Sequence, residues 1–200
     1  MEFIKLDINS HDLQKVAELI FDTEPTVFSL LFGKNKDKAL YRIKNVVKIG
    51  KNSFGHEHIY LAFEGGQIFG LTVIYSGDEI DLKVESDKFS EALDFFGRLR
   101  LFFYEKVLLD RLLITKIEKN DLYISNVCVD KEKRGKGIGN FILKNIVEYA
   151  KSWQCERIIL DVSKNNNAAI NLYRKIGFKK NIERSSKIWR ITVINMIKNL

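Results

Sequence analysis

The first fifty residues carry apolar side chains at a helical spacing. A short apolar stretch at residues 3–6 predicts a strand, and Ser10 stands where it could cap the helix that follows. Apolar residues then recur every three or four positions, which is the pattern of helices that each bury one face. They are Leu13, Val16, Ala17, Ile20 and Phe21 in the first helix, Val27, Leu30 and Leu31 in a second ending near Gly33, and Leu40, Ile43 and Val47 in a third ending at Gly50.

The period changes after residue 58. Residues 59–63 and 68–74 are rich in β-branched and aromatic side chains, and Gly65-Gly66 lies between them. Two glycines between two such runs are typical of a tight hairpin turn. We therefore expect an antiparallel pair of strands here.

Residues 86–113 return to helical spacing and are apolar on nearly all sides. Phe89, Leu93, Phe96 and Phe103 form one stripe, which is widened by Phe95, Phe102 and Leu109. Strands and helices then alternate, with strands predicted at 122–129, 157–162 and 189–196 and helices at 138–151 and 168–176. This alternation predicts an α/β fold with a right-handed crossover.

Composition favours a single domain over residues 1–200. The chain has 200 residues, 46% of them hydrophobic, which is enough for one substantial core, and its single proline and twelve glycines form no linker. The N-terminal residues lack the pattern of a signal peptide, and no apolar run approaches the roughly 20 residues that a membrane span needs. We therefore expect a cytoplasmic protein that does not bind membranes.

The net charge of +7 suggests an anionic partner. The basic run in the first third of the chain has few aromatic neighbours, so we expect a solvated helix face there and no nucleic-acid partner. Its members are Lys34, Lys36, Lys38, Arg42, Lys44 and Lys48. The two cysteines, Cys128 and Cys155, each lie in an apolar segment, so we expect core packing and neither a disulfide nor a metal site.

A glycine-rich turn joins the strand that ends at Val129 to the next helix. Its sequence is Arg134-Gly135-Lys136-Gly137-Ile138-Gly139-Asn140. Glycines at a helix start let phosphate oxygens approach the backbone N–H groups, and the helix dipole and Arg134 add favourable charge. The alternative is a flexible basic turn. A Walker loop is excluded because Gly137 follows Gly135-Lys136, and a dinucleotide fingerprint is excluded because Ile142 occupies the position of its third small residue.

Two motifs resemble those of the GCN5-related N-acetyltransferase (GNAT) superfamily. The first is Arg134-x-x-Gly137-x-Gly139, and the second is Asn166-x-x-Ala169-x-x-Leu172-Tyr173-x-x-x-Gly177-Phe178. The resemblance implies a central mixed, mostly antiparallel sheet with a splayed parallel strand pair, flanked by helices, and acetyl-CoA as acetyl donor without a metal. Residues 81–120 are then a helical insertion, because most members pass from the hairpin to the cofactor strand through a short loop.

The resemblance also implies a cofactor site. The pantetheine arm would lie along the main chain of Val127, Cys128 and Val129 as an added strand. Asn166 would hydrogen-bond polar groups of the cofactor, with a helix N-cap as its alternative role. The pyrophosphate would meet Arg134 and the N–H groups of Gly135, Lys136, Gly137, Ile138, Gly139 and Asn140.

Tyr173 matches the tyrosine that in many members donates a proton to the departing thiolate of CoA. A phenol with a reference pKa near 10 stays protonated at neutral pH and suits that role. The alternative is an aromatic ring that packs Leu172 and Phe178 together.

The general base is not evident. Some members place Glu or His on the strand entering the glycine turn, where this chain has Tyr123 and Ser125, and neither is a good base at pH 7. The acidic candidates nearby are Glu105, Glu118 and Asp121. We expect direct attack in a ternary complex without a covalent acyl-enzyme, because Cys128 alternates with its neighbours and points to the opposite face.

The resemblance therefore predicts an N-acetyltransferase acting on a primary amine of a small molecule or of a protein or peptide. Two alternatives stay open, a catalytically silent acyl-CoA-binding regulatory module and an acetyltransferase acting on aminoacyl-RNA. The phenylalanine-rich insertion either roofs the acceptor pocket or forms a homodimer contact, with additional core as the third interpretation.

Overall fold

The computed structural model describes residues 1–95, 97–99, 115–186 and 191–200. Seven strands form one sheet in the order β1-β2-β3-β4-β5-β7-β6. All neighbours pair antiparallel except β4 and β5, which are parallel. The strands are β1 (Glu2–Lys5), β2 (Ile59–Glu64), β3 (Gln67–Ser76), β4 (Asp121–Val129), β5 (Arg157–Ser163), β6 (Lys179–Ser186) and β7 (Ile191–Asn199). The mixed, mostly antiparallel sheet expected from the resemblance is confirmed.

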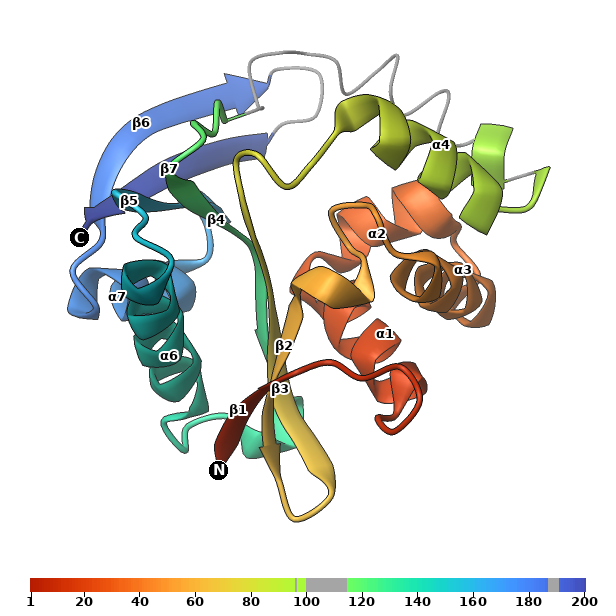
Figure 1. Ribbon diagram of the computed structural model, residues 1–200, viewed down its shortest axis with the longest axis horizontal. Coiled ribbons are helices and arrows are strands. Elements are labelled where there is room, and N and C mark those ends of the chain that lie inside the picture. Colours follow the sequence, from red (N-terminus) through yellow and green to blue (C-terminus); the bar gives the residue numbers. More distant parts are fainter. Residues whose placement is uncertain (96, 100–114, 187–190) are drawn as a thin grey trace.

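Helices cover both faces of the sheet (Figure 1). One apolar core lies against α1 (Leu13–Thr23), α2 (Pro25–Phe32) and α3 (Lys36–Ile49), and the other against α6 (Ile138–Ser152) and α7 (Asn167–Lys175). We call these two faces the α1–α3 face and the α6–α7 face. The remaining helices are α4 (Leu82–Ala92) and the 3-10 turns η1 (His56–His58) and η2 (Lys131–Lys133). No helix in the described part of the chain is long and apolar enough to cross a membrane.

The N-terminal helices follow the apolar spacing, with one correction at the first cap. The side chain of Asp12, not Ser10, accepts hydrogen bonds from the backbone N–H groups of Gln14 and Lys15. The Ser10 hydroxyl instead donates to Asp7. Two residues of capping type stand close together in the sequence. The helix starts after the second, whose carbonyl accepts the first helical bond from the Val16 N–H at 3.1 Å.

The β2–β3 hairpin forms as predicted. Gly65 and Gly66 have φ values of 56° and 78°, which glycine adopts without the steric cost that a Cβ would add. Strand β1 pairs with the outer edge of β2, which brings the start of the chain to the sheet.

Strand β6 was not predicted from the sequence. Its residues, Lys179–Ser186, are mostly polar and charged and lack an apolar alternation. They pair antiparallel with β7 at the end of the sheet, so only one neighbour strand is needed and polar side chains are tolerated. The predicted final strand is confirmed from Ile191 onward, and its expected start at Trp189 lies outside the described residues.

The predicted helical insertion is described over α4 and residues 93–95, 97–99 and 115–120. Phe89 and Leu93 pack on the core of the α1–α3 face, and Phe89 contacts Phe54 edge to face. Phe95 is 73% exposed. Phe96, Phe102 and Phe103, on which the prediction of a roof or dimer contact depended, lie outside the described residues.

Arg42 corrects the expectation of a solvated basic helix face. Its side chain is buried, and its guanidinium donates to both carboxylate oxygens of Asp94 at 3.0 and 2.8 Å and to the Phe32 carbonyl. The bidentate pair lowers the pKa of Asp94. Arg42 therefore ties the segment after α4 to α2 and α3, because its long side chain reaches a carboxylate that is remote in sequence.

Candidate active site

The glycine turn is an open anion-binding loop at the start of α6. Helix α6 has no side-chain cap, and its first intrahelical bond runs from Phe141 N–H to the Gly137 carbonyl at 2.9 Å. Within the described residues, none of the N–H groups from residues 135 to 140 donates to a protein acceptor outside the helix. Free donors at a helix N-terminus are suited to a phosphate group.

Glycine is required at the three positions of the turn for different physical reasons. Gly135 and Gly137 have φ values of 77° and 79°, and an added Cβ would meet no protein atom within 4 Å at either position. An added Cβ at Gly139 would lie 2.9 Å from Leu172 Cδ2 of helix α7. Gly135 and Gly137 therefore provide the backbone conformation and leave open space, whereas Gly139 permits α6 and α7 to approach each other.

Strand β4 carries a bulge at Ser125 that opens the sheet beside it. In the register with β3, Asn126 pairs with Val73 and Ile124 pairs with Ile74, so Ser125 is the extra residue. Pairing with β5 runs from Asp121–Arg157 and ends at Ile124–Leu160. The expected splayed parallel pair is thus present, and it opens at the bulge.

The main chain of β4 is exposed to this gap beyond the bulge. The Asp130 N–H donates to the Phe69 carbonyl of β3, so by alternation the N–H and C=O groups of Val127 and Val129 point away from β3. The Val129 carbonyl accepts from Arg134 Nε at 3.2 Å. These are the backbone groups expected to pair with a pantetheine arm.

A polar network holds the bulge against α1. The Asn126 side chain donates to Thr23 Oγ1 and accepts from Ser125 Oγ, each at 2.8 Å, and Thr72 Oγ1 donates to the Asn126 carbonyl at 2.8 Å. Thr23 is the last residue of α1. The network therefore fixes the end of α1 next to the gap.

A cleft of about 460 Å³ joins the glycine turn, the free edge of β4 and helix α7. Lys136 is the one predicted cofactor residue that does not line it. The predicted residues that do are Val127, Cys128, Val129, Arg134, Gly135, Gly137, Ile138, Gly139, Asn140, Asn166 and Tyr173, joined by Asp22, Thr23, Ala168, Ala169 and Leu172. The side chain of Asn166 accepts from the Ala169 N–H at 3.1 Å, so it caps α7 and lies at the cleft.

Tyr173 lines the cleft from the last turn of α7. It is 8% exposed, its ring packs against Phe178 at 5.8 Å between centroids, and no described residue hydrogen-bonds its hydroxyl. Burial raises the pKa of Tyr173 to about 12. The phenol is therefore fully protonated at neutral pH and can act as a proton donor.

Comparison with known proteins agrees with this geometry. A model of the acetyltransferase (GNAT) family matches residues 22–178, which includes the bulge, the glycine turn and α7. The chain belongs to the GNAT acetyltransferase family.

Individual relatives match a shorter region. The uncharacterized N-acetyltransferase YobR of Bacillus subtilis is 43% identical over 67 residues, which is 34% of this chain and 27% of that protein. The spermine/spermidine N(1)-acetyltransferase of Bacillus subtilis is 35% identical over 63 residues, which is 31% of this chain and 41% of that protein. The matches thus span less than half the length of either relative.

Solved structures match over nearly the whole chain. An N-acetyltransferase from Staphylococcus aureus Mu50 has a TM-score of 0.76 at 21% identity and covers 99% of this chain and 100% of that one. The ribosomal-protein-S18-alanine N-acetyltransferase from Escherichia coli has a TM-score of 0.56 at 13% identity and covers 99% and 92%. At these identities the similarity shows the GNAT fold.

Two of the acidic candidates for a general base lie away from the cleft of this GNAT member. Asp121 is 1% exposed and forms a bidentate pair with Arg157 at 2.7 and 2.8 Å. It starts β4, roughly 26 Å along the strand from Val129 at 3.3 Å per residue. Glu118 is exposed and pairs with Lys116 at 2.8 Å. Glu105 lies outside the described residues.

The two β4 residues at the family's base positions are engaged with neighbours. Tyr123 donates its hydroxyl to Asp161 at 3.0 Å, and Ser125 donates to Asn126. Burial and then the negative charge of Asp161 raise the pKa of Tyr123 well above its ordinary value. Tyr123 is therefore a donor and not a base.

Asp161 is an acidic residue at the gap that the sequence reasoning missed. It lies in β5 directly after Leu160, at which the pairing with β4 ends. A signal was present in the sequence, since Asp161 is the one charged residue inside the apolar run Ile158–Val162. A charge in a buried strand points to a polar site.

Cys128 behaves as a core residue, as its alternation along β4 predicts. It is 5% exposed and packs on the α1–α3 face, opposite Val127 and Val129. Burial raises the pKa of its thiol to about 11, so it is almost entirely protonated at neutral pH.

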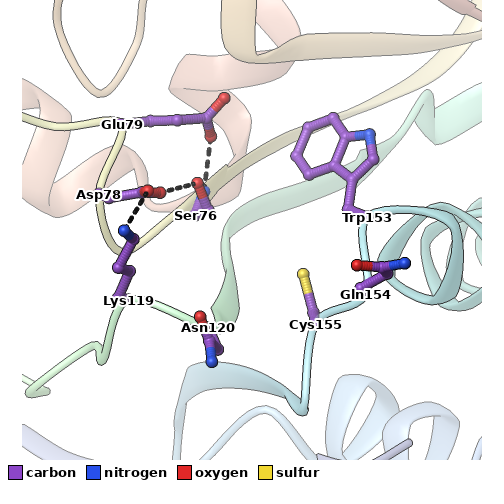
Figure 2. Close-up of a pocket in the computed structure, with 8 residues that line it drawn as sticks. All are labelled: Ser76, Asp78, Glu79, Lys119, Asn120, Trp153, Gln154 and Cys155. Carbon is purple, nitrogen blue, oxygen red and sulfur yellow. Dashed lines mark hydrogen bonds and ion pairs between the residues drawn. The ribbon is translucent and has the colours of Figure 1, made fainter.

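A second hollow of about 480 Å³ lies at the opposite end of the sheet (Figure 2). It is lined by Ser76, Asp78, Glu79, Lys119, Asn120, Trp153, Gln154 and Cys155. Asp78 accepts a hydrogen bond from the Ser76 hydroxyl at 2.8 Å, and Glu79 accepts one from the Ser76 backbone N–H at 2.6 Å. This hollow is remote from the glycine turn, so the cleft at α6 and α7 is the candidate active site.

Proposed function

We propose that this chain is an acetyl-CoA-dependent N-acetyltransferase that acts on a primary amine of a small molecule or peptide by direct attack in a ternary complex. The observation that carries the proposal is the single cleft in which the glycine turn, the free edge of β4 and Tyr173 meet. Acetyl-CoA bound there supplies an acetyl group activated as a thioester.

The residues present fit that donor. The free N–H groups at the start of α6 suit a pyrophosphate, and the space beside Gly135 and Gly137 is open where a Cβ would otherwise project. The main-chain groups of Val127 and Val129 offer a strand edge to the pantetheine amides. Their N–H groups also face the gap, where one of them polarises the thioester carbonyl.

Tyr173 completes the chemistry. The neutral amine forms the new C–N bond to the acetyl carbon, the C–S bond breaks, and the Tyr173 hydroxyl gives its proton to the departing thiolate. After the C–N bond forms, the nitrogen loses a second proton, and solvent returns a proton to the Tyr173 phenolate. The proton that the acceptor ammonium loses before attack also passes to solvent, so the transfer releases one proton overall. A phenol with a pKa of about 12 retains its proton until negative charge develops on sulfur.

The relatives support an amine acceptor of more than one size. One is named for spermine and spermidine, and the Escherichia coli neighbour is named for the alanine of a ribosomal protein. We therefore propose a primary amine as the acceptor, and the experiment below tests both small-molecule and peptide amines.

The experiment measures CoA release and product mass with acetyl-CoA and three acceptors, namely spermidine, a lysine-containing peptide and a peptide with a free N-terminus. Tyr173→Phe should lower kcat about 10²-fold with acetyl-CoA KM unchanged, since a positioned general acid contributes on that order. Tyr60→Phe is the matched control, because Tyr60 is also buried but packs against Tyr149 away from the cleft.

Two outcomes would replace the proposal. Binding of CoA without turnover of any amine would identify a catalytically silent acyl-CoA module. Acetylation of an aminoacyl-RNA, with affinity that falls steeply as salt rises, would identify the RNA-directed alternative that the net charge of +7 permits.

A further inference from the structure

Asp161 lies at the mouth of the β4–β5 gap, on the sheet face away from α6 and α7. The last parallel pair is Ile124–Leu160, and Asp161 is the next residue of β5. Leu160 and Val162, on either side of it, pack in the core of the α6–α7 face. By strand alternation the Asp161 side chain projects to the opposite face.

The Asp161 carboxylate is held by three neutral donors. Oδ1 accepts from Thr115 Oγ1 at 2.9 Å and from Asn195 Nδ2 at 3.0 Å, and Oδ2 accepts from the Tyr123 hydroxyl at 3.0 Å. A carboxylate offers about four acceptor positions. One position is therefore left, and it is on Oδ2.

The charge of Asp161 is not neutralised by its described surroundings. Within the described residues, no Lys, Arg or His nitrogen lies within 4.0 Å of it, whereas Asp121 and Glu183 each have such a partner. Arg184 is linked to it only through Thr115, whose Oγ1 accepts from Arg184 at 2.9 Å and donates to Asp161. A partly buried carboxylate with oriented neutral donors and a free lone pair is built to receive a cation.

The position of Asp161 also fits the direction of attack. Tyr173 reaches the gap from the α6–α7 side, together with the side chains of Val127 and Val129, while Asp161 and Tyr123 lie on the other side. An amine held by Asp161 would meet the thioester from the face opposite the general acid. That arrangement keeps nucleophile and leaving group apart.

We propose that Asp161 is the anionic residue that binds the acceptor amine in its cationic form at the gap, so that the acceptors are aliphatic amines protonated at neutral pH. This inference rests on the proposed function. Asp161 then acts as a specificity-determining residue, and Tyr123 and Thr115 orient its carboxylate.

The test compares a cationic acceptor with a neutral one of nearly the same shape. The probes are n-pentylamine, which is protonated at pH 7.5, and O-butylhydroxylamine, which is not. Wild-type protein should show a KM for pentylamine at least tenfold below that for the hydroxylamine. Asp161→Asn should remove the difference by raising the pentylamine KM roughly 10- to 100-fold, which is the loss expected for one charge-assisted hydrogen bond. KM for acetyl-CoA should not change.

Controls separate recognition from folding. Asp78→Asn makes the same change at a carboxylate of the second hollow, remote from the gap, so it should retain the preference for pentylamine. Asp161→Glu should restore part of it. If Asp161→Asn does not fold, the wild-type preference and its loss at high salt decide the question, because binding of the neutral probe should not depend on salt.

Failure of this inference differs from failure of the proposed function. Equal KM values for the two probes in the wild type, or an unchanged ratio in folded Asp161→Asn, would overturn the role of Asp161 while leaving transfer intact. If the wild type acetylates no amine, calorimetric titration of spermidine into the CoA-saturated protein still reads the site, and equal binding by wild type and Asp161→Asn would overturn it.

Discussion

Replacing Gly137 by alanine places one carbon in the space where phosphate oxygens are expected. The new Cβ would meet no protein atom within 4 Å, so any loss of binding arises from the ligand side. The backbone φ of 79° adds strain, because an L-residue with a Cβ disfavours that region by roughly 1–2 kcal/mol. The variant therefore carries two effects, which need to be separated.

Gly66 provides the matched control. Its φ is 78°, and an added Cβ there also meets nothing within 4 Å, but it lies in the β2–β3 hairpin and does not line the cleft. Gly66→Ala and Gly137→Ala should each lose roughly 1–2 kcal/mol of stability. For a domain of this size that lowers Tm by about 2–8 °C without ligand.

Coenzyme A then distinguishes the two variants in a thermal unfolding assay. At 100 times its Kd, CoA should stabilise the wild type and Gly66→Ala by about 2.7 kcal/mol, or about 5–11 °C in Tm. If the added carbon weakens binding 100-fold, the same concentration gives Gly137→Ala only about 0.4 kcal/mol, or about 1–2 °C. A full CoA shift in Gly137→Ala would refute phosphate binding at this turn.

Two further predictions concern stability and reactivity. Arg157→Met should lose about 3 kcal/mol of unfolding free energy, because it leaves the buried carboxylate of Asp121 without its partner. Urea denaturation measures this loss, and a value below about 1 kcal/mol would contradict a stabilising role of the ion pair. A thiol reagent at pH 8 should label Cys155 before Cys128, because Cys128 is 5% exposed and burial raises its pKa to about 11. Peptide mapping identifies the labelled residue, and preferential labelling of Cys128 would show that β4 opens in solution.

Short-range sequence patterns predicted the elements around the proposed cofactor cleft. The glycine turn, the hairpin at Gly65-Gly66 and the helices after residue 137 follow from glycine placement and apolar spacing, which act locally. Strand β6 escaped prediction because an edge strand needs only one partner and no apolar face. Arg42 escaped because its burial depends on Asp94, which is 52 residues away.

The surroundings of Asp161, which we propose binds the acceptor, were less predictable for the same reason. Asp161 gains its surroundings from β4, β7 and the segment before β4, through Tyr123, Asn195 and Thr115. No local pattern brings these residues together. The sequence shows only that a charged residue interrupts an apolar strand, and the sheet order supplies the rest.

The bulge at Ser125 links the two sides of the site. Before the bulge, the even-numbered residues Leu122 and Ile124 pack on the α6–α7 face. After it, the odd-numbered residues Val127 and Val129 pack on that same face. A strict alternation from residue 122 to 129 would assign one half of β4 to the wrong face. The extra residue also ends the pairing with β5.

One inserted residue therefore has three consequences for the chemistry. It frees the N–H and C=O groups of Val127 and Val129 from a strand partner, which leaves them available to a thioester arm. It opens the gap at which we propose that Tyr173 and Asp161 act from opposite faces. It also places Asn126 against Thr23 at 2.8 Å, so the end of α1 is fixed to the strand that we propose binds the donor. In the proposed mechanism the reacting atoms are thus positioned by an irregularity of the sheet, so the β4 side chains at the gap can be residues as unreactive as valine.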